Sequence, residues 1–477
     1  MTCLTSFSNN LIALLLLCCA CVLSSCSGLG LTKPQILSLQ TEKDSPQAAF
    51  SGDIVWQAQV AGGTAPLTYE FSVMTDKQES VVQKGPENHW RWRPRNPGKF
   101  RIRVRVEDAK GYKAASDWIY FRIGPALDHN SRIAFFPVEN LSGVKAPLVE
   151  IGNEYRELLR TAGMQLLSDE RLENFTFRHR VRYSGGIDSE LARALREEEG
   201  VDAVVITSLE SFDGSSSPKI ALTSRLVLCH DTPQIVWIDG VGITGDDAPG
   251  LLGLKRVGDI EVLQRKALRT LQDSMEDYLA GERHYGAPNR AEIMPRDFYL
   301  ATDFIPGRQY RVAVVPFLNR YARRNAGFVI PLHFVRLLHR HANLEVVEPG
   351  VVRQQLLKYR LIMQAGPSLA VADVLASDST IAADLILSGY VFDYQDQFGT
   401  PKIDFSTRLF SGSRRQIVWW SRSYANGDDG VYFYDFGRYR STHVMLQEMV
   451  QAIGDLLFPQ ENYQPPSAVE PSGFSIH

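Results

Sequence analysis

The sequence predicts a multidomain protein in which an all-β sandwich is followed by two tandem α/β domains. Residues 54–123 contain short strands of alternating apolar and polar residues, separated by turn residues, which is typical of a sandwich. Strands and helices then alternate, and the pattern recurs after about 180 residues, a period too long for a solenoid repeat. One α/β fold must therefore account for both copies.

The recurrence is visible in short matching segments. The segment QIVW at residues 234–237 returns at 416–419, and GDD at 245–247 returns at 427–429. Upstream, RIAFFPVEN at 132–140 is matched by RVAVVPFLN at 311–319. We assign residues 131–283 to repeat 1 and 309–458 to repeat 2. Residues 284–308 are then a proline-containing linker, and residues 459–477 a disordered tail.

The first 26 residues carry a targeting signal. Residues 11–23 are almost entirely apolar, but a helix needs about 20 apolar residues to cross a bilayer, so the run is typical of a signal-peptide core. It ends in Leu23-Ser24-Ser25-Cys26, which resembles the lipobox of bacterial lipoproteins. The resemblance implies a signal peptide at residues 1–25, palmitate-type lipidation of Cys26, and a lipidated tether at residues 26–32.

The same resemblance implies a location. More than one acyl chain gives stable membrane anchoring, and Ser27 is not the aspartate that retains such lipoproteins at the inner membrane. We therefore expect a lipid anchor in the outer membrane, with the protein mainly on the periplasmic side. Residues 1–10 contain no Lys or Arg, so a short N-terminal membrane helix or a non-cleaved signal is the alternative.

Composition limits the remaining function classes. Of the six cysteines, Cys229 is the only one beyond residue 26. No disulfide can form within the mature chain once Cys26 is acylated, so its domains must be held together by their cores. With 44% hydrophobic residues and a net charge of −3, the chain can build such cores and has no charge excess for binding nucleic acid.

The sandwich is expected over residues 33–124. Its clearest strand is FRIRVRV at residues 100–106, a strict alternation that buries one face of a sheet and wets the other. The stretch from Trp92 to Tyr112 has Pro97-Gly98 before this strand and the turn Asp108-Ala-Lys-Gly111 after it. This stretch resembles immunoglobulin-like modules of the PKD and triple-tyrosine type. The resemblance implies an immunoglobulin-like β-sandwich and no particular ligand.

A basic cluster with two tryptophans lies in and before this strand. Its members are Arg91, Arg93, Arg95, Lys99, Arg101, Arg103 and Arg105, interleaved with Trp90 and Trp92. One interpretation is a patch for anionic envelope polymers, with the tryptophans stacking on sugars. The other, which we prefer, is a solvated sheet face whose charges prevent aggregation, with the tryptophans in the core.

Each α/β repeat is predicted to run through the same order of elements. The helix at residues 189–199 is the best defined, because Asp188 can cap its start and Gly200 its end. Repeat 1 is expected to contain strands at 133–136, 164–167 and 203–206, helices at 154–161 and 189–199, a hairpin at 219–228 and 235–241, and a final helix at 259–279. Repeat 2 is expected to contain the corresponding segments at 312–315, 332–340, 344–347, 351–359, 383–390, 402–410, 417–424 and 442–457.

This order of elements resembles a group of bacterial envelope lipoproteins that share the TolB amino-terminal fold and include CsgG and LpoB. The resemblance is carried by residues 133–140 and 312–319, which form the first strand and the following Pro and Asn, and by residues 234–247 and 416–429 at the end of the hairpin. It implies a three-layer α/β fold and a place in the cell envelope, without a specific activity.

Residues that could support catalysis or metal binding are few. The carboxylates of Asp246, Asp247, Asp428 and Asp429 are expected to bond to nearby backbone amides instead of a metal ion. His333, His339 and His341, with Arg336 and Arg340, are expected to form a solvated basic helix face, because no Cys or Glu completes a zinc set. No known nucleophile or phosphate-binding motif occurs. We therefore expect no catalytic residue, no metal and no cofactor.

One loop differs between the copies. After the acidic turn, repeat 2 has Tyr432, Phe433, Tyr434 and Phe436, where residues 248–256 of repeat 1 have no aromatic residue. Aromatic loops are typical of protein interfaces, although these rings could instead cap the core of repeat 2. The preferred hypothesis is a non-enzymatic outer-membrane lipoprotein that acts as a scaffold or as an assembly or secretion factor.

Its expected partners are the membrane and envelope proteins of unknown identity, and self-association into a homo-oligomer is left open. A peptidoglycan- or polysaccharide-binding module is the first alternative, and a hydrolase that uses the acidic turns is the second.

Overall fold

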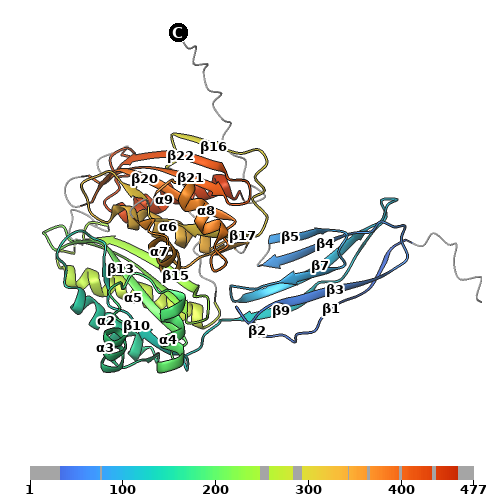
Figure 1. Ribbon diagram of the computed structural model, residues 1–477, viewed down its shortest axis with the longest axis horizontal. Coiled ribbons are helices and arrows are strands. Elements are labelled where there is room, and N and C mark those ends of the chain that lie inside the picture. Colours follow the sequence, from blue (N-terminus) through green and yellow to red (C-terminus); the bar gives the residue numbers. More distant parts are fainter. Residues whose placement is uncertain are drawn as a thin grey trace, which may run out of the picture. The chain divides into compact units, whose positions relative to one another are not determined.

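The chain is multidomain and rich in β-sheet, with several helices. The computed structural model describes residues 33–75, 78–247, 257–282, 293–341, 343–362, 366–396, 400–431 and 437–459. It divides into two compact units, of which the first ends at Gly124 and the second begins at Pro125, apart from Arg95–Pro97, which belong to the second. In Figure 1 the first unit is blue to cyan and the second green to red. Within the described residues, no helix combines the length and the apolar character that a membrane span requires.

The first unit consists of two β-sheets. The smaller sheet has the order β1-β3-β6 and the larger has the order β2-β9-β7-β4-β5, with β8 paired to β7. Their strands are β1 (Gln35–Thr41), β2 (Gln47–Ala48), β3 (Ile54–Ala61), β4 (Thr68–Thr75), β5 (Gln78–Gly85), β6 (His89–Trp92), β7 (Gly98–Glu107), β8 (Lys113–Ala115) and β9 (Ile119–Gly124).

Aromatic side chains fill the space between these two sheets. Trp92 on β6 makes an edge contact with Phe100 on β7, with ring centroids 5.0 Å apart, and Trp56 on β3 makes one with Phe121 on β9. Trp90 and Trp92 stack on each other and are 3% and 8% exposed. The structure therefore confirms that both tryptophans belong to the core, where no sugar can reach them.

The basic side chains of the first unit lie beside carboxylates. Arg103 on β7 bonds to Glu79 at 2.8 Å, and Arg105 bonds to Glu70 at 3.0 Å. Asp53, just before β3, accepts from Arg93 at 2.6 Å. The positive charge of the basic cluster is therefore partly compensated, which weakens the interpretation as a patch for anionic polymers.

Repeat 1 forms a mixed sheet of six strands. The order is β12-β10-β13-β14-β15, with β11 paired to β13. Strands β10 to β13 pair in parallel, whereas β13, β14 and β15 form an antiparallel meander. Its elements are β10 (Arg132–Phe135), β11 (Glu139–Asn140), α2 (Leu148–Thr161), β12 (Gln165–Leu166), α3 (Asp169–Arg178), α4 (Ser189–Glu199), β13 (Ala203–Asp213), β14 (Lys219–Leu228), β15 (Gln234–Thr244) and α5 (Ile260–Leu279).

Repeat 2 has the same topology with one additional strand. The order is β16-β22-β21-β20-β17-β19, with β18 paired to β20. The additional β16 comes from the stretch expected to be a linker, and it pairs with β22. The elements are β16 (Asp297–Leu300), β17 (Tyr310–Val314), β18 (Leu318–Asn319), α6 (Ala326–His339), β19 (Leu344–Val346), α7 (Pro349–Lys358), α8 (Leu369–Ser377), β20 (Leu385–Gln395), β21 (Lys402–Ser411), β22 (Gln416–Asn426) and α9 (Thr442–Leu457).

Local sequence signals account for many of these elements. Helix α4 has the predicted bounds, since the Asp188 side chain accepts from two backbone amides and Gly200 ends the helix with a φ of 64°. Helix α2 begins earlier than expected, at Leu148, and helices α3 and α8 were not predicted. Both missed helices are short, which makes their periodicity hard to recognise.

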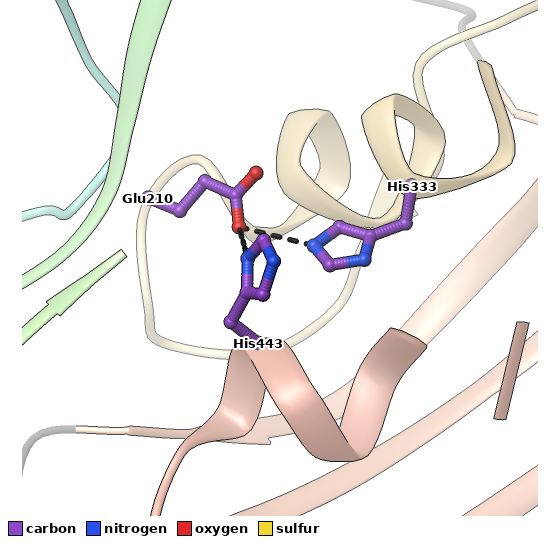
Figure 2. A group of neighbouring side chains, drawn as sticks. All are labelled: Glu210, His333 and His443. Carbon is purple, nitrogen blue, oxygen red and sulfur yellow. Dashed lines mark hydrogen bonds and ion pairs between the residues drawn. The ribbon is translucent and has the colours of Figure 1, made fainter. Parts of the chain in front are cut away.

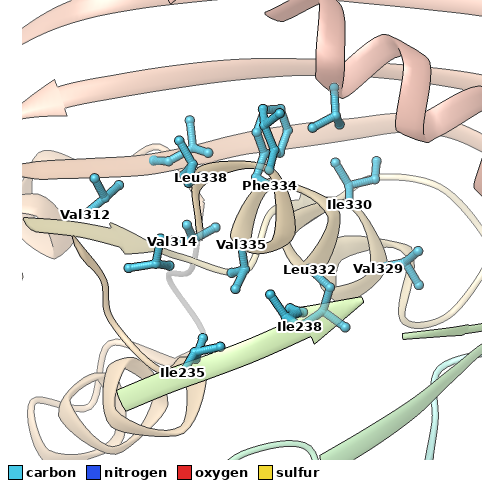
Figure 3. Close-up of a cluster of buried hydrophobic side chains, with 14 of the residues drawn as sticks. Ile235, Ile238, Val312, Val314, Val329, Ile330, Leu332, Phe334, Val335 and Leu338 are labelled. Carbon is cyan, nitrogen blue, oxygen red and sulfur yellow. The ribbon is translucent and has the colours of Figure 1, made fainter. Parts of the chain in front are cut away.

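Helix α6 lies between the sheets of the two repeats. Thirteen of its fourteen residues are buried, including Pro331, His333 and Arg336. Figure 3 shows Phe334 and Leu338 pointing toward the sheet of repeat 2, while Leu332 and Val335 face β15 of repeat 1. One hydrophobic core runs through both repeats. The prediction of a solvated basic face is therefore wrong for His333, Arg336 and His339, because apolar residues on every side of α6 bury the helix together with its polar residues.

Candidate functional site

A β-bulge brings an ionisable side chain to the contact between the repeats. In the pairing of β13 with β14, the register shifts between Leu209 and Ser211, so Glu210 is the additional residue. A bulge redirects the side chain it carries. Glu210 is only 1% exposed, and its carboxylate meets two histidines of repeat 2.

These histidines come from different helices. His333 of α6 places Nε2 at 3.0 Å from Oε2 of Glu210, and His443 of α9 places Nδ1 at 2.7 Å from the same oxygen. Figure 2 shows the two rings converging on the carboxylate from separate helices. The hydroxyl of Thr223 on β14 donates to the other carboxylate oxygen, Oε1. Glu210, His333 and His443 thus form one buried group, which we call the Glu-His-His cluster.

Two glycines of β15 make room for the cluster. A Cβ atom on Gly240 would lie 2.5 Å from Nη1 of Arg336, and one on Gly242 would lie 2.5 Å from Cβ of His443. Both distances are far below van der Waals contact. At Gly240 the atom met is the end of the Arg336 side chain, whereas at Gly242 it is the first side-chain atom of His443, so a larger residue at position 242 would force α9 away from β15. Arg336 uses this space to donate from Nη1 to the carbonyl oxygen of Gly240 at 2.8 Å.

The hydrogen bonds indicate how the protons are distributed. Burial alone would raise the pKa of the Glu210 carboxyl, but the electrostatic influence and the hydrogen bonds of His333 and His443 outweigh burial and hold this pKa well below its usual value. Burial lowers the pKa of His333 to about 4, against the opposing effect of Glu210. A carboxylate that accepts N–H bonds from His333 and His443 satisfies this arrangement at neutral pH.

Two histidines and one glutamate are also the ligand set of some zinc sites, and the three ligand atoms lie within 4.8 Å of one another. The surroundings do not fit a metal ion. A ligating imidazole normally donates its second N–H to an acceptor. Here Nε2 of His443 faces the donor Nη1 of Arg336 at 3.5 Å, and Nδ1 of His333 has no partner among the described residues. The arrangement instead fits a hydrogen-bonded chain from Arg336 through His443 to Glu210.

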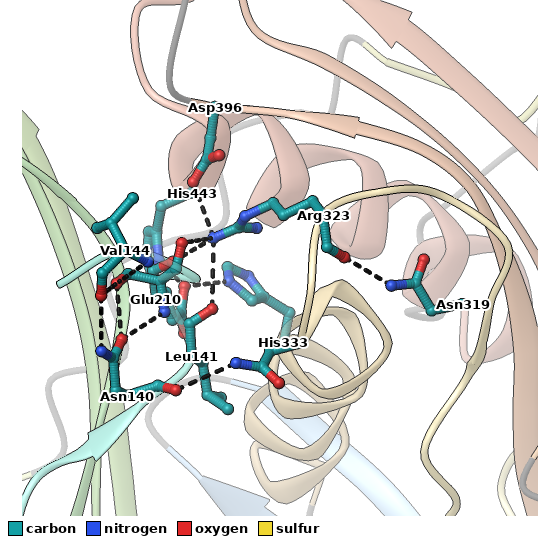
Figure 4. A network of polar contacts seen from close by, with 11 residues as sticks. Asn140, Leu141, Val144, Glu210, Asn319, Arg323, His333, Asp396 and His443 are labelled. Carbon is teal, nitrogen blue, oxygen red and sulfur yellow. Dashed lines mark hydrogen bonds and ion pairs between the residues drawn. The ribbon is translucent and has the colours of Figure 1, made fainter.

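A second polar contact between the repeats is centred on Arg323. Its Nη2 donates to the backbone oxygen of Glu210 at 2.5 Å and lies 2.8 Å from Oδ2 of Asp396, while the guanidinium covers the ring of Tyr394. Figure 4 shows Arg323 between Glu210 and Asp396. Burial raises the pKa of Asp396, and Arg323 opposes that rise. This contact fixes the end of β13 in repeat 1 to the loop after β18 in repeat 2.

The asparagines that the repeat comparison aligned have matching roles at this contact. The side-chain amide of Asn140 donates to the carbonyl oxygen of Val144 at 2.8 Å, and that of Asn319 donates to the carbonyl oxygen of Arg323 at 2.6 Å. Each asparagine therefore closes the corresponding loop in its own repeat by bonding to the residue four positions later. In repeat 2 this loop presents Arg323 to repeat 1.

A third contact is the fully buried ion pair of Arg225 and Glu348. Arg225 on β14 donates from Nε and Nη2 to the two carboxylate oxygens of Glu348 at 3.1 and 2.9 Å. Glu348 is the residue before α7 and caps that helix. Neither side chain is exposed, so the pair joins the sheet of repeat 1 to a helix start of repeat 2.

The acidic turns agree with the prediction for Asp247 and Asp429, whereas Asp246 and Asp428 bond to side chains and not to backbone amides. Asp247 accepts from the backbone amide of Thr244 at 2.7 Å, and Asp429 accepts from the amide of Asn426 at 2.8 Å. Asp246 bonds to the hydroxyl of Ser217, and Asp428 bonds to Arg438. These carboxylates therefore hold the two turns in place.

The lipidation residue and the aromatic loop lie outside the described residues. This holds for Cys26 and for Tyr432, Phe433, Tyr434 and Phe436. Their proposed roles stay predictions. The Glu-His-His cluster was not predicted from the sequence. One Arg and two His within an otherwise apolar helix were the available signal, because buried polar side chains need hydrogen-bond partners in the core.

No protein-family model and no curated protein matches this sequence. Several solved structures give weak likenesses. The PelC dodecamer from Paraburkholderia phytofirmans is 15% identical, with 34% of this chain and 94% of that chain covered and a TM-score of 0.23. The LpoB C-terminal domain from Salmonella enterica is 18% identical, with 24% and 84% covered and a TM-score of 0.21.

The lipoprotein GNA1162 from Neisseria meningitidis is 15% identical, with 30% and 99% covered and a TM-score of 0.22. TM-scores of this size establish neither a shared fold nor a shared function for this chain.

Proposed function

We propose that this protein is a non-enzymatic scaffold or assembly factor of the bacterial cell envelope, anchored to the outer membrane by lipid on Cys26. The anchor and its location follow from the lipobox-like segment of residues 23–26. The scaffold role follows from how the two α/β repeats are joined. A scaffold needs a rigid body with separate outer surfaces, and the repeats provide such a body.

The observation that carries the proposal is the burial of the Glu-His-His cluster. Its residues have the functional groups of an acid–base site, yet Glu210, His333 and His443 are 1%, 2% and 1% exposed. A general acid or base must reach its substrate within hydrogen-bonding distance. Closed to solvent and bonded to each other, these side chains hold repeat 1 against repeat 2.

One observation weighs against each alternative. The polysaccharide-binding hypothesis used Trp90 and Trp92 as stacking platforms, and both are buried. The hydrolase hypothesis used the acidic turns, where Asp247 and Asp429 bond to local backbone amides. Sedimentation of the purified protein with cell-wall sacculi tests the first, since a scaffold without wall affinity stays in the supernatant.

The direct test is crosslinking in intact cells followed by purification from detergent-solubilised membranes. We expect the tagged wild-type protein to recover a reproducible set of envelope proteins, quantified by mass spectrometry. Tyr432→Ala with Tyr434→Ala should reduce this recovery without changing the melting temperature, whereas Asp428→Asn with Asp429→Asn should cost modest stability only. The scaffold proposal is wrong if the double aspartate variant folds normally but no longer performs the protein's function in cells, while the double tyrosine variant recovers all partners.

A further inference from the structure

The two repeats present the same sheet face in the same register. In repeat 1, Ile206, Arg225 and Ile238 are cross-strand neighbours on β13, β14 and β15. In repeat 2, Ser388, Arg408 and Trp420 occupy the corresponding row on β20, β21 and β22. Phe392 is the bulged residue of β20, as Glu210 is of β13. Each position of one face therefore has a known counterpart on the other.

Repeat 1 uses this face to bind repeat 2, but repeat 2 cannot bind a further repeat in the same way. Gly240 and Gly242 allow the close approach of α6 and α9, and their counterparts in the register of repeat 2 are Arg422 and Tyr424. These large side chains occupy the space that the two helices would need. The head-to-tail stacking consequently ends after two repeats, as polar capping repeats end a solenoid.

One residue of the face is nevertheless retained. Arg408 is the counterpart of Arg225, and the two differ in what they bind. Arg225 holds the carboxylate of Glu348 through two hydrogen bonds. Arg408 makes no ion pair with any described residue, and its Nε is buried without a hydrogen-bond partner there. The face of repeat 2 thus keeps the counterpart of the carboxylate-binding arginine of repeat 1, and no described carboxylate pairs with it.

Aromatic rings hold the cations of this face in place. The guanidinium carbons of Arg320 and Arg408 lie 4.5 and 5.8 Å from the ring centre of Tyr390, and that of Arg422 lies 3.7 Å from the centre of Phe392. Asp404 compensates Arg422 at 2.7 Å, and Asp393 compensates Lys402 at 2.6 Å. Arg320 and Arg408 remain uncompensated by any carboxylate in the part of the chain that the structure describes.

We propose that this face, composed of Arg320, Tyr390, Phe392, Arg408, Trp420 and Arg422, binds an acidic polypeptide segment whose carboxylate docks on Arg408. The equivalent position in repeat 1 already holds a glutamate carried by a folded polypeptide. A guanidinium fixed on a ring is well prepared for bidentate binding of a carboxylate. Arg320 supplies the second positive charge.

A polypeptide fits the face better than a glycan does. Sugar binding would need open aromatic faces, but guanidinium groups lie over the rings of Tyr390 and Phe392, two of the three aromatic residues of the face. Arginine together with Trp and Tyr is the composition typical of the energetic centres of protein interfaces. The inference rests on the proposed scaffold function and specifies the chemistry of one partner surface.

The test is a binding titration with the purified full chain in non-ionic detergent and fluorescently labelled poly-L-glutamate, monitored by anisotropy. We expect saturable binding that weakens with added salt. Arg408→Gln should weaken this binding at least about tenfold. The affinity of Arg408→Lys should lie between those of the wild type and Arg408→Gln, because lysine keeps the charge and loses the bidentate geometry. The matched control is Arg193→Gln, which removes an exposed arginine of α4 that pairs with Asp231 and should bind like the wild type.

Three outcomes would overturn the inference. They are absence of poly-L-glutamate binding, an equal loss in Arg193→Gln and Arg408→Gln, and equal or tighter binding of polygalacturonate, which carries its carboxylates on a sugar backbone. A failure here leaves the scaffold proposal intact if crosslinking in cells still recovers partners. Circular dichroism of each variant shows that a loss of binding is not a loss of folding.

Discussion

Arg225 and Glu348 form a bidentate ion pair that joins the two α/β repeats with neither side chain exposed to solvent. The residues are distant in sequence, and each belongs to a different repeat. Removing one partner of such a pair leaves an uncompensated charge in the interior, which costs more than the pair itself contributes.

The first prediction concerns this pair. Glu348→Gln should lower the free energy of unfolding of the second unit by about 3–5 kcal/mol, because Arg225 is left buried and unpaired. Urea unfolding followed by circular dichroism measures the change. The control is the double variant Arg225→Met with Glu348→Leu, which replaces both charges by apolar groups and should recover most of the loss. A single variant as stable as the wild type would show that the pair is open to solvent.

The sequence predicted the framework of this interface and missed its polar contents for identifiable reasons. Segment matches and turn residues located both hairpins. Glu210, however, lies on a bulge, and strand alternation cannot predict a register shift that turns one residue to the other face. Proline is normally excluded from helix interiors. The predicted helix therefore began after Pro331, and the first turns of α6 were missed. Without those apolar turns, the histidines and arginines of α6 resembled a solvated face.

The sequence could not predict which residues pair across the contact between the repeats, and the reason is different. Glu348 is an ordinary helix cap in its own repeat, and only the packing of two whole domains brings it to Arg225. The same limit applies to Gly240 and Gly242. These two positions differ between the hairpins of the two repeats. The side chains that the glycines accommodate, Arg336 and His443, are identified only by the folded structure.

The second prediction concerns those glycines. Gly240→Ala should destabilise the second unit by about 1–3 kcal/mol, the usual cost of overpacking, because its Cβ would lie 2.5 Å from Nη1 of Arg336 and 2.8 Å from Oγ1 of Thr223. Gly258→Ala is the matched control, since a Cβ there would meet nothing within 4 Å. Melting temperatures of both variants test this. Equal melting temperatures would mean that the two repeats are not packed as closely as described.

The third prediction concerns acid. The pKa of His333 is about 4 in the folded protein, below its ordinary value of 6.5, so the unfolded chain binds more protons between these values. Stability should therefore fall as the pH drops from 6.5 toward 4, by at most about 1.4 kcal/mol per pH unit for this group. The pKa of Glu210 is also lowered, which adds a loss of the same sign below its ordinary value of 4.5.

Urea unfolding at several pH values between 7.5 and 4.5 measures this dependence. The groups that face His333 are Glu210 of β13, His443 of α9 and Arg336 of its own helix. His333→Gln should flatten the profile between pH 6.5 and 4.5, whereas His129→Gln, at an exposed position, should leave it unchanged. A profile of equal slope in the wild type and in His333→Gln would assign the acid sensitivity to other groups.

The fourth prediction concerns metal ions. A zinc ion bound by Glu210, His333 and His443 would stabilise the folded state by mass action and raise the melting temperature with concentration. Arg336 places a positive charge and an N–H donor beside His443, where a bound metal would require an acceptor. We therefore expect the melting temperature of the wild-type protein to stay unchanged in two separate measurements, one with equimolar zinc and one with an excess of EDTA. A rise with zinc that disappears in His333→Gln would contradict this and identify the cluster as a metal site, with Arg336 displaced from His443 on binding.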